Sequence, residues 1–212
     1  MGHITPEMLM RAYGLGVFPM SEHRDDPEIF WVDPKRRGVF PIDDFHISRS
    51  LTKRIRRGGF RVSLNKDFEG VLDGCADRSD TWINGEIRKL YIALHEKSQA
   101  HSIEVWSEDD RLIGGVYGVT LGAAFFGESM FSRATDASKI ALAYLTTHLS
   151  KCGFELFDTQ FLTEHLQSLG AIELSRDEYH EALAKAVVKQ ADIQAYSLPS
   201  AAAVVQRRTQ TS

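Results

Sequence analysis

The sequence predicts an α/β fold of the α+β kind, in which a largely antiparallel sheet is flanked by helices. Three observations predict it. Of the 212 residues, 43% are apolar and 25% are charged, as in packed globular proteins. Strand-like runs follow one another from residue 101 to 131 with only turn signals between them. Segments with helix-capping signals stand before and after these runs.

Helix starts are marked by residues that cap the first turn. Thr5, followed by Pro6 and Glu7, places a cap, a proline and an acid where a helix N-terminus favours them. Ser175 and Glu178 have the spacing of a capping box. The expected helices run from Thr5 to about Gly14 or Gly16, Ser48 to Gly58, Asn65 to about Ala76, Asn84 onward, Asp136 to Gly153, Thr163 to Leu169 and Ser175 to about Ala191.

Strands are expected where short apolar runs lie between turn residues. The central runs, 101–106, 111–120 and 123–131, are separated by the acidic turn 108–110 and by Gly122, so we expect an antiparallel meander. Shorter strands are expected at 28–32, 38–40, 60–64, 154–158 and 171–174.

The order of elements predicts a small N-terminal domain at 1–60 and a larger catalytic domain at 61–192. The C-terminal tail, 193–212, contains Ala-Ala-Ala and Thr-Gln-Thr and few residues that would anchor it. We therefore expect this tail to be mobile.

Several protein classes are not predicted. Cys75 and Cys152 are too few for a disulfide framework and form no Cys-x-x-Cys pair, which indicates reduced cysteines in a cytosolic protein. The N-terminus lacks the regions of a signal peptide. The longest uncharged stretch, 112–127, is too short to span a membrane and contains five glycines.

Basic residues are concentrated in one segment. Nine lie between Lys35 and Arg61 against two acidic ones, a local charge of +7 that leaves −11 for the rest of a chain with net charge −4. A basic surface on an acidic protein can hold a phosphate backbone, and a solvated helix face is the alternative.

Glycines interrupt the predicted strands at 114–118 and again at Gly122 and Gly127. A glycine inside a strand needs a reason, such as a bulge or the close approach of a ligand, and a sharply bent sheet is the alternative. The segment matches neither a dinucleotide fingerprint nor a phosphate-binding loop.

Glu128 lies in an aromatic strand, where burying a carboxylate is costly unless it has a partner. Strand alternation places Glu128 and Met130 on one face and Phe131 on the other. Beside an apolar surface this acid can meet a ligand that is part cationic and part apolar. Pairing with an Arg or Lys at the sheet edge is the alternative.

Asp158 and Gln160 share a face at the carboxyl end of a strand, where α/β sheets tend to bind ligands. They can align a nucleophilic amine and accept its proton, or they form a structural hydrogen-bonded pair. The histidines show no zinc spacing, and Ser129 and Ser132 lack the surroundings of a catalytic serine. Neither metal nor serine catalysis is predicted.

Ordered motifs along the chain point to one family. Together they resemble the leucyl/phenylalanyl-tRNA–protein transferases of bacteria over about residues 5–180. The motifs are Gly14-Leu15-Gly16-Val17-Phe18-Pro19-Met20, His46-Ile47-Ser48-Arg49-Ser50, Thr81-Trp82-Ile83, Leu94-His95 with Ala100-His101-Ser102-Ile103-Glu104-Val105-Trp106, Gly114-Gly115-Val116-Tyr117-Gly118, Gly127-Glu128-Ser129-Met130-Phe131-Ser132, Ala137-Ser138-Lys139, Asp158-Thr159-Gln160 and Ser168-Leu169-Gly170-Ala171.

The resemblance implies transfer of Leu or Phe, sometimes Met, from aminoacyl-tRNA to the N-terminal Arg or Lys of a protein. The transfer would mark that protein for degradation by the N-end rule. The resemblance also implies a C-terminal domain like the GCN5-related acetyltransferases and a cytoplasmic enzyme that uses no membrane, metal or cofactor. Because the aminoacyl ester is already activated, the remaining task is to align a neutral amine and remove one proton.

The resemblance also assigns roles to residues. Asp158 and Gln160 would polarise the amine, and Glu128 would help to position substrate. The side-chain pocket would be lined by Val116, Phe125, Met130, Leu145 and Phe157. The terminal adenosine of the tRNA would meet Tyr13, Met20, Trp82 and Tyr91, although some relatives have Trp where Met20 stands. The tRNA backbone would lie on Arg49, Lys53, Arg54, Arg56 and Arg57.

Two other functions are alternatives to aminoacyl transfer. An N-acetyltransferase would need a pyrophosphate-binding loop, and residues 133–138 lack its glycines. A tRNA-binding protein without catalysis is the second, and the presence of Glu128, Asp158 and Gln160 argues against it.

Overall fold

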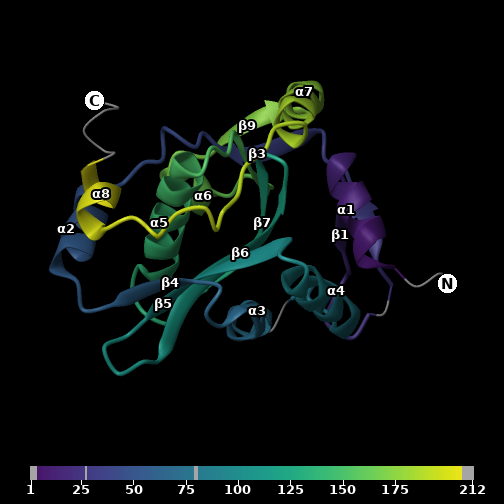
Figure 1. Cartoon of the computed structure of the whole chain (residues 1–212). Helices are drawn as coiled ribbons and strands as arrows, with labels where there is room; N and C mark the ends of the chain where they lie inside the picture. The colour runs from purple at the N-terminus through teal and green to yellow at the C-terminus, as the bar shows by residue number, and fades with distance from the viewer. Residues whose placement is uncertain (1–3, 27, 79–80, 207–212) are drawn as a thin grey trace.

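A seven-stranded sheet forms the centre of the protein in a computed structural model that describes residues 4–26, 28–78 and 81–206 (Figure 1). All neighbouring strands are antiparallel except β7 and β8, which are parallel. In sheet order the strands are β4 (Arg61–Leu64), β5 (Ala100–Trp106), β6 (Leu112–Leu121), β7 (Ala124–Ser132), β8 (Leu156–Gln160), β3 (Arg36–Phe40) and β9 (Ile172–Ser175). The predicted meander, β5 to β7, and the largely antiparallel sheet are confirmed.

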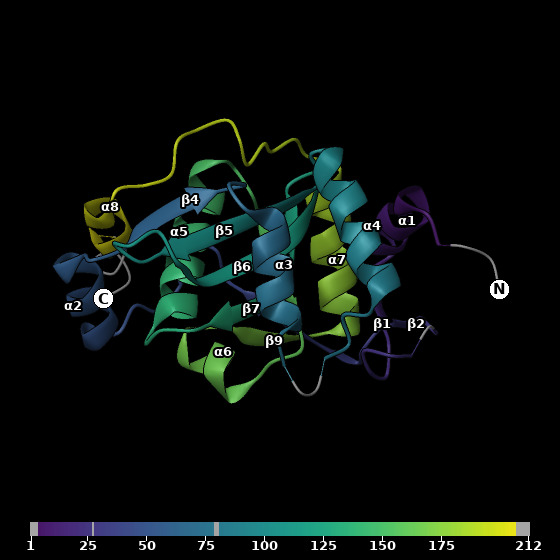
Figure 2. The same cartoon turned by 90° about the horizontal axis from the view of Figure 1, so that it is seen from below.

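Helices cover both faces of this sheet (Figure 2). Alternate strand residues supply the two faces, because successive side chains of a strand point in opposite directions. Val116 and Phe125 belong to the cluster under α2 and α5, whereas Tyr117 and Phe126 belong to the cluster under α1, α3, α4 and α7. The helices are α1 (Pro6–Gly14), α2 (Arg49–Arg57), α3 (Phe68–Ala76), α4 (Gly85–Glu96), α5 (Ala137–Lys151), α6 (Glu164–Ser168), α7 (Arg176–Val187) and α8 (Ala201–Gln206).

Five of the predicted helix caps are confirmed. In each, the side-chain oxygen accepts a hydrogen bond from a backbone amide of the first turn, which has no partner within the helix. These caps are Thr5, Ser48, Asn84, Thr163 and Ser175, the last as part of a capping box with Glu178.

Two predicted helix starts are wrong in detail. Asp67, not Asn65, caps α3. Asn65 has a φ of 56° and accepts a hydrogen bond from the backbone amide of Ser102, so it serves the sheet instead. Asp136 does precede α5, but its side chain forms no cap and pairs with Lys139 at 2.9 Å.

The N-terminal segment joins the large sheet. After α1 the chain forms a small sheet of β1 (Phe18–Met20) and β2 (Phe30–Val32), and then β3 enters between β8 and β9. The division at residue 60 stays a prediction. The sheet order nevertheless shows that residues 36–40 share the core of the larger part of the chain.

The C-terminal segment is packed against the core as far as residue 206, which the sequence did not predict. The backbone carbonyl of Ile193 accepts a hydrogen bond from the His148 ring at 2.7 Å, and Val204 and Val205 are buried where α8 meets α2 and α5. A short run of alanines and valines was too weak a signal for this helix. Residues 207–212 lie outside the described part of the chain. Within the described residues, no helix has the length and apolar character needed to cross a membrane.

We expect Val204→Ala to lower the free energy of unfolding by about 2 kcal/mol, because two buried carbons are lost and a cavity remains. Val188→Ala is the matched control, since Val188 is 79% exposed and should change stability by less than about 0.5 kcal/mol. Urea unfolding measures both. Equal effects would show that α8 does not stabilise the fold.

Candidate active site

Glu128 occupies a β-bulge in β7. Tyr117 pairs with Ser129 and Gly118 pairs with Gly127, so Glu128 has no partner of its own in the β6–β7 ladder. Gly118 is needed here, because a Cβ atom would stand 2.6 Å from the Phe125 ring. One interrupting glycine therefore marks a bulge, as one of the sequence interpretations proposed.

The bulge changes the face on which Glu128 lies. Its carboxyl group bonds to Tyr13 and Tyr91, which belong to the same core cluster as Phe131, whereas Met130 packs against the opposite cluster. The prediction that Glu128 shares a face with Met130 and not with Phe131 is wrong. Simple alternation fails because one extra residue shifts the pleat.

Two tyrosine hydroxyls and the side-chain amide of Gln160 contact the Glu128 carboxyl group. The Tyr13 hydroxyl lies 2.6 Å from Oε1, and the Tyr91 hydroxyl lies 2.6 Å from Oε2. The two hydroxyls lie 2.7 Å from each other. The side-chain amide of Gln160 donates to Oε2 at 3.1 Å. No cation bonds to this carboxyl group among the described residues.

The pKa of Glu128 is raised to about 7 from an ordinary value of 4.5. Burial is the main cause, since Glu128 is 7% exposed, and the nearby charge of Asp158 adds to it. Hydrogen bonds from Tyr13, Tyr91 and Gln160 act in the opposite direction. A carboxyl group with this pKa can both accept and give a proton near neutral pH.

Asp158 has every lone pair engaged. Its Oδ1 accepts from Arg37 Nε at 2.9 Å and from the Gln160 backbone amide at 2.8 Å. Its Oδ2 accepts from Arg37 at 2.6 Å and from the Tyr179 hydroxyl at 2.9 Å. Asp158 is 0% exposed. This arrangement suits a fixed charge better than a group that takes protons from substrate.

Arg37, which pairs with Asp158, is also buried and bonded through each of its guanidinium nitrogens. It is 1% exposed, and its guanidinium lies 4.5 Å from the centre of the Phe18 ring and 4.4 Å from that of the Tyr179 ring. Its remaining nitrogen donates to the carbonyl of Gly16. Burial by itself lowers the pKa of Arg37, but the hydrogen bonds and charge of Asp158 outweigh this and raise it. The sequence did not identify Arg37 as a site residue.

Gln160 links the two carboxyl groups. Its backbone amide donates to Asp158, and its side chain donates to Glu128. Its φ of 65° lies in the left-handed region, which is uncommon for a residue with a side chain. The three residues predicted to be catalytic therefore lie together. Strand alternation alone did not predict how their side chains are arranged.

A cavity of about 80 Å³ opens beside Glu128. Val116, Met130 and Phe157, three of the residues that the resemblance assigned to a side-chain pocket, line this cavity. Phe125 and Leu145 are not among its lining residues; both are buried in the core, where Phe125 packs edge-on against Phe157. Among the described residues, the sequence missed Leu142 and Leu166, although Leu142 lies one helical turn before Leu145 on α5.

Two family models match the chain. One, described as leucyl/phenylalanyl-tRNA protein transferase, covers residues 39–184, and the other, described as the N-terminal domain of that transferase, covers residues 2–35. The chain belongs to the leucyl/phenylalanyl-tRNA–protein transferase family. It is therefore an aminoacyltransferase, as the motifs indicated.

Relatives in this family match along the whole chain. The leucyl/phenylalanyl-tRNA–protein transferase of Ruegeria pomeroyi is 62% identical over 209 residues, which cover 99% of each chain. That of Cereibacter sphaeroides is 62% identical over 211 residues, which cover 99% of this chain and 98% of the relative.

A solved structure shares the fold at low identity. The crystal structure of FemX superposes with a TM-score of 0.53 at 12% identity, over 79% of this chain. The match spans 66% of the FemX chain. At this identity the similarity concerns the fold alone.

The residues that the transferase family resemblance assigned to an adenosine divide into two groups. Tyr13 and Tyr91 are 0% exposed with their hydroxyls on Glu128, so a stacking contact with a base does not fit them in this structure. Met20 and Trp82 are half-buried. The Ser21 hydroxyl donates to the Trp82 carbonyl, which brings these two segments together.

The basic residues of α2 form an outward face. Leu51, Thr52 and Ile55 are buried against the core. Within the described part of the chain, none of the five predicted backbone contacts forms an ion pair. Four are exposed, and Arg54 is half-buried over the Phe60 ring. The exposed ones are Arg49, Lys53, Arg56 and Arg57.

We expect the free energy of unfolding of the wild-type protein to fall relative to Glu128→Gln as pH rises. Below about pH 4.5 Glu128 is protonated in both the folded and the unfolded protein, and above about pH 7 it is ionised in both. Between these values the unfolded state has released a proton that the folded state still holds, so ionisation costs stability. The difference should reach roughly 3 kcal/mol.

Urea unfolding at several pH values measures this difference. Glu181→Gln is the control, because Glu181 lies exposed on α7 and its curve should parallel that of the wild type. A Glu128→Gln curve that also parallels the wild type would contradict the raised pKa.

Proposed function

We propose that this protein transfers Leu or Phe, and sometimes Met, from aminoacyl-tRNA to the N-terminal Arg or Lys of acceptor proteins. The observation that supports it best is an apolar cavity lined in part by Glu128, a buried residue whose carboxyl group has its pKa raised to about 7. In this proposal the transfer marks acceptors for N-end-rule degradation in the cytoplasm, and the catalytic domain is related in fold to the GCN5-related acetyltransferases.

The chemistry needs one proton moved and no further activation. The α-amino group of the acceptor attacks the ester carbonyl, a C–N bond forms, and the C–O bond to the ribose breaks. The nitrogen loses one proton and the ribose oxygen gains one. An α-amino group has a pKa of about 7.7–8.0, so a base of pKa about 7 is well matched to it.

The structure supports a division of roles among the three site residues. Glu128, which lines the cavity, would take the proton, and the Gln160 amide would orient the reacting groups. Asp158 would supply a fixed negative charge and hold Gln160, because its own oxygens are already bonded. This revises the expectation that Asp158 itself accepts the proton.

The cavity would select the aminoacyl group by its apolar side chain. Met130, Leu142 and Leu166 offer no partner to a charged side chain, which would have to be desolvated on entry. Leu and Met differ little in such a pocket, by about 1–3 kcal/mol. Some transfer of Met follows from this.

The tRNA would extend from the site toward α2. Met20 and Trp82 would contact the terminal adenosine, where a stacked aromatic contributes about 1–3 kcal/mol. The exposed cations of α2 would hold backbone phosphates. α2 and α1 lie at opposite ends of the molecule in both views, a span suited to a large ligand (Figure 1, Figure 2).

We expect Glu128→Gln to slow transfer of labelled Leu or Phe from charged tRNA to a protein beginning with Arg by about 100-fold or more, because the base is lost. Binding of charged tRNA should change little. Glu181→Gln should match the wild type in both measurements. A wild-type protein that binds charged tRNA but transfers nothing at any pH would overturn the proposed function.

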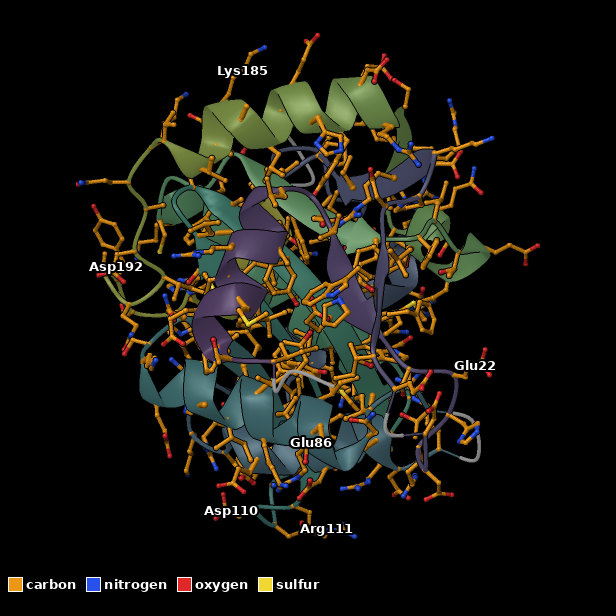
Figure 3. All side chains as sticks on the ribbon, turned by 90° about the vertical axis from the view of Figure 1, so that its right-hand side faces the viewer. Glu22, Glu86, Asp110, Arg111, Lys185 and Asp192 are labelled. Carbon is orange, nitrogen blue, oxygen red and sulfur yellow. The ribbon has the colours of Figure 1, made fainter. Side chains whose placement is uncertain are left out.

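We expect Lys53→Glu to weaken tRNA binding and to reduce the slope of log affinity against log salt by about 1, since one phosphate contact is lost. Lys185→Glu is the matched control: it makes the same charge change on α7, where Lys185 points into solvent (Figure 3). If both variants have the wild-type slope, the basic face of α2 is only a solvated surface.

A further inference from the structure

The contacts around Glu128 allow its protons to be counted. Glu128, Tyr13 and Tyr91 form a closed ring of three contacts at 2.6, 2.6 and 2.7 Å, each short enough for an O–H···O hydrogen bond. Three hydrogen bonds need three protons. Each tyrosine hydroxyl has one, so the tyrosines supply two.

The third proton has to come from Glu128. If the carboxyl group were ionised, two protons would serve three contacts, and one pair of oxygens would face each other at 2.6–2.7 Å with lone pairs only. The ring closes when Glu128 is protonated. All three residues are buried, so water does not compete for these contacts.

The position of Gln160 shows which oxygen carries the proton. Oε2 already accepts from Gln160 and from Tyr91, whereas Oε1 meets only Tyr13. The proton therefore sits on Oε1. In the protonated form Glu128 then donates to Tyr13, Tyr13 donates to Tyr91, and Tyr91 donates to Oε2, whereas in the ionised form both hydroxyls donate to the carboxylate.

We propose that Tyr13 and Tyr91 are positioning residues that fix the place of the Glu128 proton through this ring and donate to the carboxylate when that proton leaves, which makes Glu128 able to exchange a proton with the acceptor amine. The proposal rests on the proposed function for its chemistry. When Glu128 is ionised it takes the proton from the attacking nitrogen, and the ring closes. It then gives that proton to the ribose oxygen as the ester C–O bond breaks, so Glu128 returns to its starting state.

Other charged and titratable groups near Glu128 come from every side of the site. Asp158 on β8 acts against its ionisation, and Gln160 donates to it. The others are Arg37 on β3, Tyr117 on β6, and Arg78, which donates to the neighbouring residues Ser129 and Met130.

Single-atom changes test the ring. Tyr13→Phe and Tyr91→Phe each remove one hydroxyl that bonds Glu128. Tyr117→Phe is the matched control, because Tyr117 is 0% exposed in the same cluster but its hydroxyl forms no hydrogen bond with the described residues. Rapid single-turnover transfer at saturating charged tRNA is followed against pH for all four proteins.

The acid limb of this profile should have its midpoint near pH 7 in the wild type. It should move upward by about one pH unit in Tyr13→Phe and in Tyr91→Phe, because the ionised carboxyl group loses a hydrogen-bond donor. Tyr117→Phe should keep the wild-type midpoint, and the apparent affinity for charged tRNA should be equal in all four. All four proteins act on the same acceptor amine. If ionisation of that amine sets the acid limb, the midpoint will be the same in every protein, and this result would overturn the proposal.

A second measurement needs no substrate. The stability difference between each protein and its own Glu128→Gln derivative should stop growing at a higher pH in each hydroxyl variant that folds, by the same amount as the shift in the transfer profile. If this shift occurs but transfer is absent from the wild type, the ring stands and the proposed function fails. If transfer is normal but neither measurement shifts, the ring is wrong.

Discussion

Arg37 and Asp158 form an ion pair from which water is excluded, with exposures of 1% and 0%. Two parallel hydrogen bonds, two flanking aromatic rings and the Tyr179 hydroxyl satisfy both groups. Removing one partner of such a pair typically costs about 3–5 kcal/mol, since a buried charge is left alone. This pair joins β3 to β8 at the point where the active site begins, and the remaining features of the site depend on it.

The ion pair gives the two neighbouring carboxyl groups different roles. Asp158 faces a full cation and holds the Gln160 backbone, whereas Glu128 meets hydroxyls and an amide. The charge fixed on Asp158 helps to raise the pKa of Glu128. Two acids with environments as different as these commonly divide the work of a site, with one held in an ion pair and one exchanging protons. The β-bulge completes the arrangement, because it turns Glu128 toward the tyrosines of α1 and α4.

Much of the fold follows from local signals in the sequence. Thr5, Ser48 and Ser175 cap helices because a hydroxyl next to a helical run satisfies a free amide, and this needs no knowledge of distant residues. The meander was predictable for a similar reason, since its turns are short and its strands are consecutive. The anchoring of α8 was not predictable, because Val204 is buried where α8 meets α2 and α5, which are distant from it in the sequence.

The sequence predicted which residues lie in the site better than it predicted how they are arranged. Glu128, Asp158 and Gln160 do lie together, but no pattern in the sequence predicts that Arg37 reaches Asp158 across 121 positions. Alternation misplaced Glu128, because a bulge depends on pairing between strands. The resemblance assigned Tyr13 and Tyr91 to the terminal adenosine, whereas in the folded chain their hydroxyl groups contact Glu128.

We infer that Glu128 keeps its proton until near neutral pH inside a site that the Arg37–Asp158 pair holds in place. Infrared difference spectra between the wild-type protein and Glu128→Gln, recorded over a range of pH, test it most directly. We expect a band from a protonated carboxyl group that is absent in the variant and disappears from the wild type with a midpoint near pH 7. A carboxylate band already complete at about pH 5.5, as expected for an ordinary glutamate, would contradict it.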